Sequence, residues 1–215
     1  MPNNMNNAAA IIDFMKIVEK LCAVTRDSRL RCGAPESDAD HILKLCWLVM
    51  LVTPYLKVKL DSARMLELAL VHDLVEAWGG DFSLSAQEKH PELAEIKKQK
   101  EREAIEHYRT LLPEPLGEKI YNLFMEFENK SSREAQVVWV LDRIDGNLQA
   151  NFYHDGDVRY WADCDGGEYY YSYTLSGNTR QKKCLEFLNE DILLQLENAV
   201  LNLGRENMRK CGIKI

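Results

Sequence analysis

The chain has 215 residues, of which 46% are hydrophobic and 28% are charged, a composition typical of one soluble globular domain. Its formal net charge of −7 argues against a broad nucleic-acid-binding surface. The apolar run Leu45–Val52 stops just before Pro54 and is too short to cross a membrane, so we expect neither nucleic acid nor membrane as a partner.

The six cysteines are scattered and form no CxxC pair, which favours unpaired thiols in a reducing cytoplasm. The N-terminal segment lacks the positively charged start of a signal peptide. We therefore expect a cytoplasmic protein in which residues 1–215 form a single domain. Within it we expect residues 1–8 to be a disordered tail.

The spacing of apolar residues predicts a mainly helical chain. Ser37 followed by Asp40 resembles a capping box at the start of the second helix, Pro54 ends that helix, and Pro91 suits the first position of the fourth. We expect amphipathic helices over residues 8–24, 38–53, 62–78, 91–112, 116–128, 131–153 and 179–209.

Residues 154–178 differ from the rest of the chain. Six of the nine tyrosines fall between Tyr153 and Tyr173, and helical periodicity is absent. We expect an irregular or hairpin insertion that packs over a pocket or at a dimer contact.

The stretch LVHDLVEAWGGD, residues 70–81, places His72, Asp73 and Glu76 in a helix that is apolar around most of its circumference. Burying such groups unpaired is costly, so they need hydrogen bonds, charged partners or a metal ion. One interpretation is a core histidine hydrogen-bonded to a local carboxylate. The other is a metal site.

Further ionisable residues lie in the neighbouring apolar helices. His41 is in the first turn of one, and Asp142 and Asp145 lie one turn apart in another. Two imidazoles with two carboxylates are typical ligands of a divalent transition metal. Spacing alone leaves both Asp142 and Asp145 open as the last ligand.

A divalent cation at such a site lowers the pKa of a coordinated water, and Glu76, one turn from His72, is placed to take its proton. The connection between the first two helices carries Arg26, Arg29 and Arg31. These arginines are either solvated loop charges or the binding site of an anion.

The ordered set of His41, His72-Asp73 and Asp142 resembles the HD superfamily of metal-dependent phosphohydrolases. The segments GAPESDADH, LVHDLVEAWGGD and EFENKSSREAQVVWVLDRIDGNLQANFY resemble the branch that contains bacterial 5′-deoxynucleotidases and eukaryotic HD-domain nucleotidases. This similarity spans about residues 26–153. It implies an all-α HD-domain helical bundle with a metal site in its core.

The resemblance also implies roles for individual residues. The substrate-binding arginine corresponds to Arg26, and the catalytic carboxylates correspond to Glu76 and Asp81. In the bacterial deoxynucleotidases a tryptophan follows this arginine, whereas this chain has Asp27, so a preference for deoxyribose is not implied. The implied metal ligands are His41, His72, Asp73 and Asp142.

The expected reaction is hydrolysis of a nucleoside 5′-monophosphate with one divalent ion, either Mn, Co, Fe, Zn or Mg, by a homodimer. One alternative is a nucleoside triphosphate or cyclic-nucleotide phosphohydrolase on the same scaffold. Another is a nucleotide-binding protein that keeps the metal without turnover.

Overall fold

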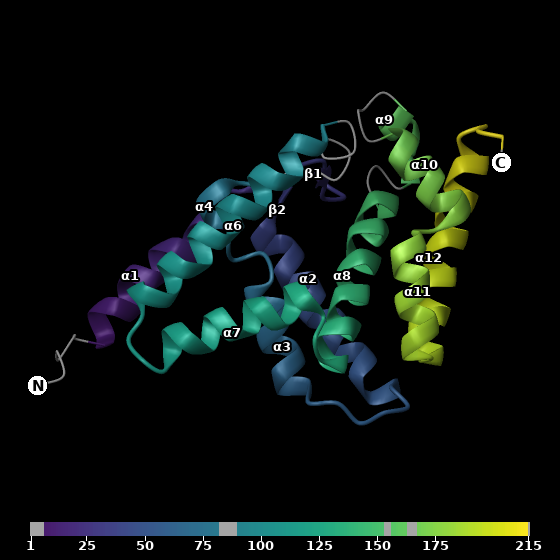
Figure 1. The fold of residues 1–215 in the computed structure, drawn as a ribbon. Coiled ribbons are helices and arrows are strands. Elements are labelled where there is room, and N and C mark those ends of the chain that lie inside the picture. Colours follow the sequence, from purple (N-terminus) through teal and green to yellow (C-terminus); the bar gives the residue numbers. More distant parts are fainter. Residues whose placement is uncertain (1–6, 82–89, 153–155, 163–166, 215) are drawn as a thin grey trace, which may run out of the picture.

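The computed structural model describes residues 7–81, 90–152, 156–162 and 167–214, and it is mainly helical, which confirms the all-α prediction (Figure 1). A two-stranded sheet pairs β1 (Thr25–Arg29) with β2 (Pro35–Ser37). The helices are α1 (Asn7–Lys20), α2 (Asp38–Val52), the single-turn helix η1 (Thr53–Tyr55), α3 (Ser62–Val71), α4 (Glu76–Gly79), α6 (Pro91–Leu111), α7 (Leu116–Asn129), α8 (Arg133–Phe152), α9 (Arg159–Ala162), α10 (Gly167–Ser176), α11 (Thr179–Leu188) and α12 (Asp191–Lys210).

Helix α8 is the central element of the bundle. It packs against α2, α3 and α7 on one side and against α11 and α12 on the other (Figure 1). Its buried side chains include Val137, Val140, Leu141 and Ile144, which join the main hydrophobic core. Apolar residues cover most of the circumference of α8, so close packing prevents the helix from rotating about its axis. The few carboxylate side chains of α8 are therefore held in fixed orientations.

The predicted capping box at the start of α2 is confirmed. The backbone N–H of Asp40 donates to Ser37 Oγ at 3.1 Å, and the backbone N–H of Ser37 donates to Asp40 Oδ2 at 2.9 Å. These bonds satisfy N–H groups that the first turn of a helix leaves unpaired. They define where α2 begins, and His41 lies fully buried in that first turn.

The predicted continuous helix over residues 62–78 is wrong, because α3 ends at Val71 and α4 begins at Glu76. Across the break the backbone tightens, with Leu74 N–H donating to Val71 O at 3.1 Å and Glu76 N–H to Asp73 O at 3.0 Å. Neighbouring residues of a regular helix do not face each other. The break therefore lets the adjacent side chains of His72 and Asp73 point to one place.

The connection that carries Arg26 is a hairpin. Strands β1 and β2 are antiparallel, with Thr25 opposite Ser37 and Arg29 opposite Pro35. Arg26 therefore extends from a strand next to the start of α2.

The C-terminal third also differs from the expected elements. The predicted last helix is divided into α11 and α12 because Asn189 adopts a left-handed conformation with a φ of 53°. In the Tyr-rich segment, the residues that the structure describes include α9 and α10 in place of an irregular loop or hairpin. Tyr170, Tyr173 and Thr174 supply the buried face of α10, so tyrosine rings make up much of its packing.

Of the expected N-terminal tail, residues 1–6 lie outside the described residues, and Asn7 and Ala8 begin α1. Residues 82–89, between the predicted helices over residues 62–78 and 91–112, also lie outside the described residues. Among the described helices, none has both the length and the apolar character required to cross a bilayer.

Candidate active site

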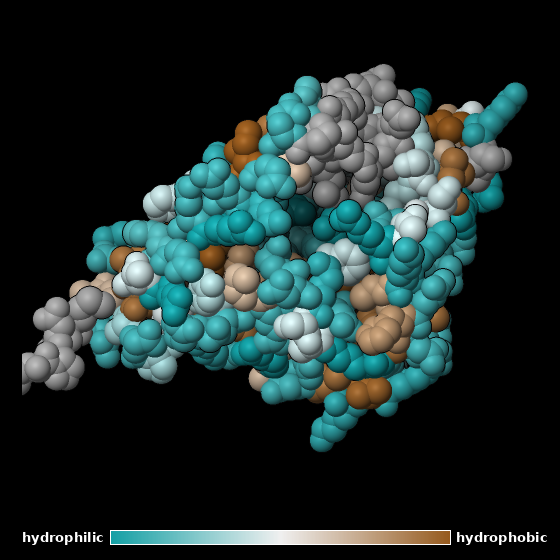
Figure 2. Space-filling view, viewed as in Figure 1, coloured by the Kyte–Doolittle hydropathy of each residue, from teal (hydrophilic) through white to brown (hydrophobic). Residues whose placement is uncertain are grey.

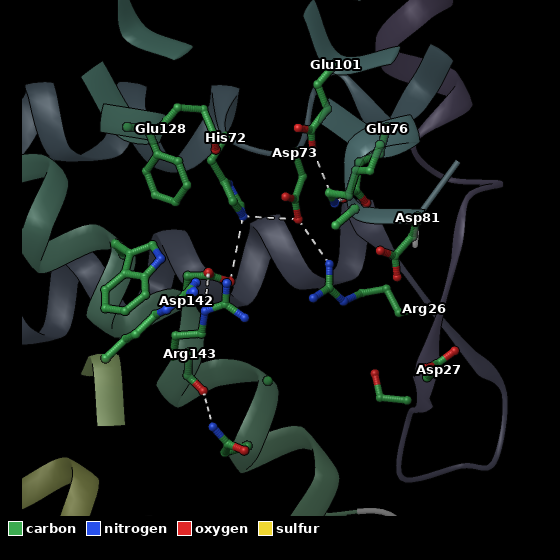
Figure 3. Close-up of a pocket in the computed structure, with 18 of the residues that line it drawn as sticks. Arg26, Asp27, His72, Asp73, Glu76, Asp81, Glu101, Glu128, Asp142 and Arg143 are labelled. Carbon is green, nitrogen blue, oxygen red and sulfur yellow. Dashed lines mark hydrogen bonds and ion pairs between the residues drawn. The ribbon is translucent and has the colours of Figure 1, made fainter. Parts of the chain in front are cut away.

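Four side chains predicted as metal ligands meet at the side of α8 that faces α2. His41 comes from α2. His72 and Asp73 come from the break between α3 and α4, and Asp142 comes from α8; Figure 3 shows these three side chains. His41 Nε2 lies 3.3 Å from His72 Nε2 and 3.0 Å from Asp142 Oδ1, and His72 Nε2 lies 3.1 Å from Asp73 Oδ2. The fold thus brings together residues that are up to 101 positions apart in the chain.

The second ring nitrogen of each histidine is occupied on the outer side. His72 Nδ1 donates to the backbone O of Ala69 at 2.8 Å, and His41 Nδ1 lies 2.7 Å from Asp145 Oδ2. A carbonyl oxygen only accepts hydrogen bonds, so His72 carries its proton on Nδ1 and turns the Nε2 lone pair inward. The carboxylate of Asp145 favours the same tautomer for His41.

The Nε2 lone pairs of both histidines and the carboxylate oxygens of Asp73 and Asp142 therefore face one another. These electron-rich atoms repel each other unless a positive charge lies among them. Burial and Arg26 lower the pKa of His41, but Asp142 and Asp145 outweigh them and raise it to about 9. Burial alone would raise the pKa of Asp73, but His72 and Arg26 hold it well below its usual range. Either a proton on His41 or a cation supplies the charge that the cluster needs.

The spacing of the four atoms suits a metal ion. In a tetrahedral or octahedral shell of radius about 2.1 Å, neighbouring ligands lie about 3.0–3.4 Å apart and opposite octahedral ligands about 4.2 Å apart. Three separations in the cluster are 3.0–3.3 Å. Two further separations, His41 Nε2 to Asp73 Oδ2 at 3.7 Å and His72 Nε2 to Asp142 Oδ1 at 3.9 Å, lie between the values for neighbouring and for opposite ligands. The residues thus fit one divalent cation bound by two imidazoles and two carboxylates.

Asp142 and Asp145, which the sequence left as rivals, lie on different sides of His41. Asp142 is at the inner nitrogen and Asp145 at the outer one, where Lys44 Nζ also lies 3.4 Å from Asp145 Oδ2. Lys44 also donates to the buried Glu36 and, at 2.7 Å, to Gln149 Oε1. This network behind His41 was missed from the sequence. A lysine and a carboxylate in apolar helices, Lys44 and Asp145, were the available signals.

Glu76 lies next to the cluster and is buried. Its Oε1 accepts a 2.7 Å hydrogen bond from Lys97 Nζ, and its Oε2 is without a hydrogen-bond partner in the described part of the chain. Burial, together with the charge of Asp73, raises the pKa of Glu76 to about 10, although Lys97 opposes the shift. Lys97 extends from α6 and is only 23% exposed, because its ammonium group points to this carboxylate.

Asp38 is a further carboxylate that the sequence analysis used only as the start of α2. It is fully buried, and its Oδ2 is unpaired within the residues that the structure describes. Burial raises the pKa of Asp38 to about 6. The unpaired oxygens of Asp38 and Glu76 add to the excess of negative character around the cluster, which again suits a cation.

Arg26 borders this acidic group. Its Nη1 donates to Asp73 Oδ2 at 3.0 Å and lies 3.5 Å from Asp38 Oδ1. Burial opposes the charge of Arg26, but Asp73 and Asp81 raise its pKa above the usual range. Asp81 lies on the wall beside Arg26, and burial raises its pKa (Figure 3).

One pocket of about 750 Å³ is lined by six of these residues: Arg26, His72, Asp73, Glu76, Asp81 and Asp142. A hollow is visible near the middle of the molecular face, bordered mainly by hydrophilic residues (Figure 2). Its volume lies within the usual range for small-molecule sites, about 300–1,000 Å³. The pocket has further lining residues that the sequence analysis did not single out, among them Lys130, Trp139, Arg143 and Arg180.

Comparison with known proteins supports the same assignment. A family model described as HD domain matches residues 18–172. The chain is 33% identical over 156 residues to 5′-deoxynucleotidase HDDC2 of Xenopus laevis, covering 70% of this chain and 72% of that protein. The human protein of that name is also 33% identical over 156 residues, covering 70% of this chain and 71% of its own length.

The fold has solved counterparts as well. A crystal structure from Magnetospirillum magnetotacticum, described as a predicted metal-dependent phosphohydrolase, covers 97% of this chain and 99% of its own with a TM-score of 0.68 and 22% identity. The helical bundle, the ordered histidines and aspartates and the extent of the matched segment agree with one another. The chain belongs to the HD domain family.

Proposed function

We propose that this protein is a metal-dependent phosphohydrolase that converts nucleoside 5′-monophosphates into nucleoside and phosphate. The relatives named 5′-deoxynucleotidase support the substrate class. The observation that carries the proposal is that His41, His72 and Asp142 present ligand atoms within 4.8 Å of one another, with Asp73 Oδ2 3.1 Å from His72 Nε2. They lie beside a pocket large enough for a nucleotide.

In this proposal His41, His72, Asp73 and Asp142 hold one divalent cation. Such a cation lowers the pKa of a water molecule and neutralises charge on phosphoryl oxygens. Arg26 orients Asp73 through their hydrogen bond and binds the phosphoryl group from the pocket wall. The geometry does not identify the ion, so Mn, Co, Fe, Zn and Mg are all to be tested.

Glu76 is the proposed general base. A cation at the cluster offsets the charge of Asp73, which with burial raises the pKa of Glu76, and so favours the ionised carboxylate. The unpaired Oε2 then accepts the proton of the attacking water, while Lys97 holds Oε1 and so fixes the carboxylate in place. Asp81 is the proposed second catalytic carboxylate on the wall beside Arg26. Asp27, which follows Arg26 in the chain, also lines the pocket and occupies the position of the tryptophan of the bacterial enzymes. The preference for ribose or deoxyribose is therefore to be measured.

The test is phosphate release from a panel of ribo- and deoxyribonucleoside 5′-monophosphates by chelator-stripped protein with each metal in turn. We expect metal-dependent release of orthophosphate and its loss, together with bound metal, in Asp73→Ala. With nucleoside triphosphates as substrates, release of pyrophosphate or triphosphate, and no orthophosphate from the monophosphates, would instead identify a nucleoside triphosphate hydrolase. Metal-dependent nucleotide binding without any product would identify a binding protein.

We further propose a homodimer that uses an exposed apolar face of α2. Leu43, Trp47, Met50 and Leu51 are exposed and lie on one side of the helix, next to a small apolar groove that Phe152 also lines. Clusters of this kind commonly mark contact surfaces. Sedimentation should give twice the 24.8 kDa chain mass, and Leu51→Glu should give a monomer. A monomeric wild type at micromolar concentration would contradict the proposal.

We also propose that residues 1–215 form one domain and that the protein is cytoplasmic. The contacts of α8 with elements from both halves of the chain support a single domain, which should unfold in one cooperative transition. The five cysteines of the described residues are all unpaired, as a reducing compartment favours. Fluorescence microscopy of the tagged protein tests the location.

A further inference from the structure

One wall of the pocket is basic and belongs to the C-terminal half of the chain. We call this the basic wall: Lys130 at the end of α7, Arg143 and Gly146 on α8, and Arg180 on α11. Arg143 lies beside Asp142, whereas Arg26 lies beside Asp73 on the other side of the pocket (Figure 3). The metal cluster therefore separates two groups of cations.

The two groups differ in how far their charges are neutralised. Arg26 is 3.0 Å from Asp73 Oδ2, and Lys97 is 2.7 Å from Glu76 Oε1. Lys130 and Arg180, by contrast, form no ion pair with any carboxylate of the described residues. Arg143 has one carboxylate nearby, Asp142, but its Nε lies 3.7 Å from Asp142 Oδ2, which is longer than a hydrogen bond. The basic wall thus has spare capacity for an external anion.

Arg143 has the clearest unused donor. Its Nε is buried and lacks a hydrogen-bond acceptor among residues 7–81, 90–152, 156–162 and 167–214. A buried donor that stays unpaired costs free energy, and a charged oxygen brought by a ligand would satisfy it.

Trp139 holds two of these cations in place. Lys130 Nζ lies 5.0 Å and Arg143 Cζ 5.6 Å from the centre of the buried Trp139 ring. Such contacts between a cation and an aromatic ring restrict the side chains before any ligand arrives. The Lys130 backbone is fixed as well, because its N–H caps α7 through Glu126 O and Phe127 O.

The wall also leaves space. Gly146 lies one turn after Arg143 and lines the pocket, and a Cβ atom built on it would meet nothing within 4 Å. Arg143 directly follows Asp142, so the wall begins next to the metal cluster. A group held there can belong to the same small molecule as the phosphate at the cluster.

We infer that the basic wall is a second anion subsite, which binds a phosphoryl group other than the one that is hydrolysed. A guanidinium fork and an ammonium are the groups that recognise phosphoryl oxygens most effectively. The inference rests on the proposed function and deepens it. The preferred substrates are nucleotides with a second phosphoryl group, such as nucleoside 3′,5′-bisphosphates.

The test compares binding of three probes to metal-stripped wild-type protein by calorimetry: adenosine 5′-monophosphate, adenosine 3′,5′-bisphosphate and inorganic phosphate. A charge-assisted hydrogen bond is expected to make the bisphosphate bind about 10–100-fold more tightly than the monophosphate. Arg143→Gln and Arg180→Gln should each reduce this ratio, and the double variant should bring it close to one.

Two further variants separate charge from space. Lys183→Gln removes a positive charge from an exposed position of the same helix, α11, outside the pocket lining, and should leave the ratio unchanged. Gly146→Leu keeps every charge and meets no neighbour at its Cβ, so it should fold and yet reduce the ratio by filling the subsite.

Equal affinity of the wild type for the two nucleotides would overturn the inference, and hydrolysis of monophosphates would then leave the proposed function standing. If wild-type protein hydrolyses neither nucleotide with any metal, the proposed function fails, and the binding ratio still decides the subsite. Arg143-dependent binding of inorganic phosphate, with equal binding of the two nucleotides, would assign the wall to free phosphate and overturn the substrate inference.

Discussion

The carboxylate behind His41 offers a sharp test of the metal site. Asp145 Oδ2 lies 2.7 Å from His41 Nδ1, and the residue is only 3% exposed. We expect Asp145→Asn to weaken metal binding although Asp145 touches none of the inner ligand atoms. The carboxylate makes the imidazole a better ligand, because its negative charge favours electron density on the opposite nitrogen.

The magnitude follows from what each substitution leaves behind. Replacing such an outer partner typically costs about 10–100-fold in metal affinity, or about 1.4–2.7 kcal/mol. The Asn side chain still offers His41 an acceptor oxygen, and Lys44 still has its hydrogen bond to Glu36. Asp145→Asn should therefore reduce metal affinity by about tenfold. Asp145→Ala removes both the charge and the hydrogen bond and should approach 100-fold. Asp142→Asn changes a ligand itself and should exceed both.

Isothermal titration of chelator-stripped protein with Zn²⁺ or Mn²⁺ gives the affinities, and circular dichroism checks that each variant is folded. Glu134→Gln, on the same helix and away from the cluster, is the matched control. If Asp145→Asn binds metal as the wild type does, or if Asp145→Asn weakens binding more than Asp142→Asn, the assignment of inner and outer carboxylates is wrong.

Three other predictions concern catalysis and stability. Glu76→Gln should retain metal, measured by elemental analysis, and lose about 10²–10⁴-fold in phosphate release; loss of the metal would show that Glu76 is a ligand. Ser37→Ala should lower the free energy of unfolding by about 1 kcal/mol in urea titration, because it removes the acceptor for Asp40 N–H; an unchanged value would contradict the capping box. Burial opposes the charge of Glu190, but the N–H of Lys57 and the side chain of Arg133 outweigh it and lower its pKa. Its contribution is thus present above the unfolded-state pKa, about 4.3, and is lost as pH falls through the folded-state pKa. The stability gap between wild type and Glu190→Gln should therefore be wide at pH 7 and shrink below about pH 4 in urea titration.

The sequence was sufficient for features that depend on local interactions. Ser37 and Asp40 are three residues apart, and their reciprocal hydrogen bonds form within one helical turn, so the start of α2 was readable. The same holds for Pro91 at the start of α6. The sequence also indicated that His41, His72 and Asp142 needed partners, because burying an unpaired ionisable group in an apolar helix costs free energy.

Only the tertiary structure decided which way each side chain faces. Asp142 and Asp145 lie one turn apart on α8, and the packing of α8 against α2 turns one to the inner nitrogen of His41 and the other to the outer nitrogen. Lys97 reaches Glu76 because α6 packs on α4. Arg180 joins the pocket of Arg26 from 154 residues away. Helical periodicity carries no information about such contacts, since it gives the apolar face of each helix but not the neighbour that covers it.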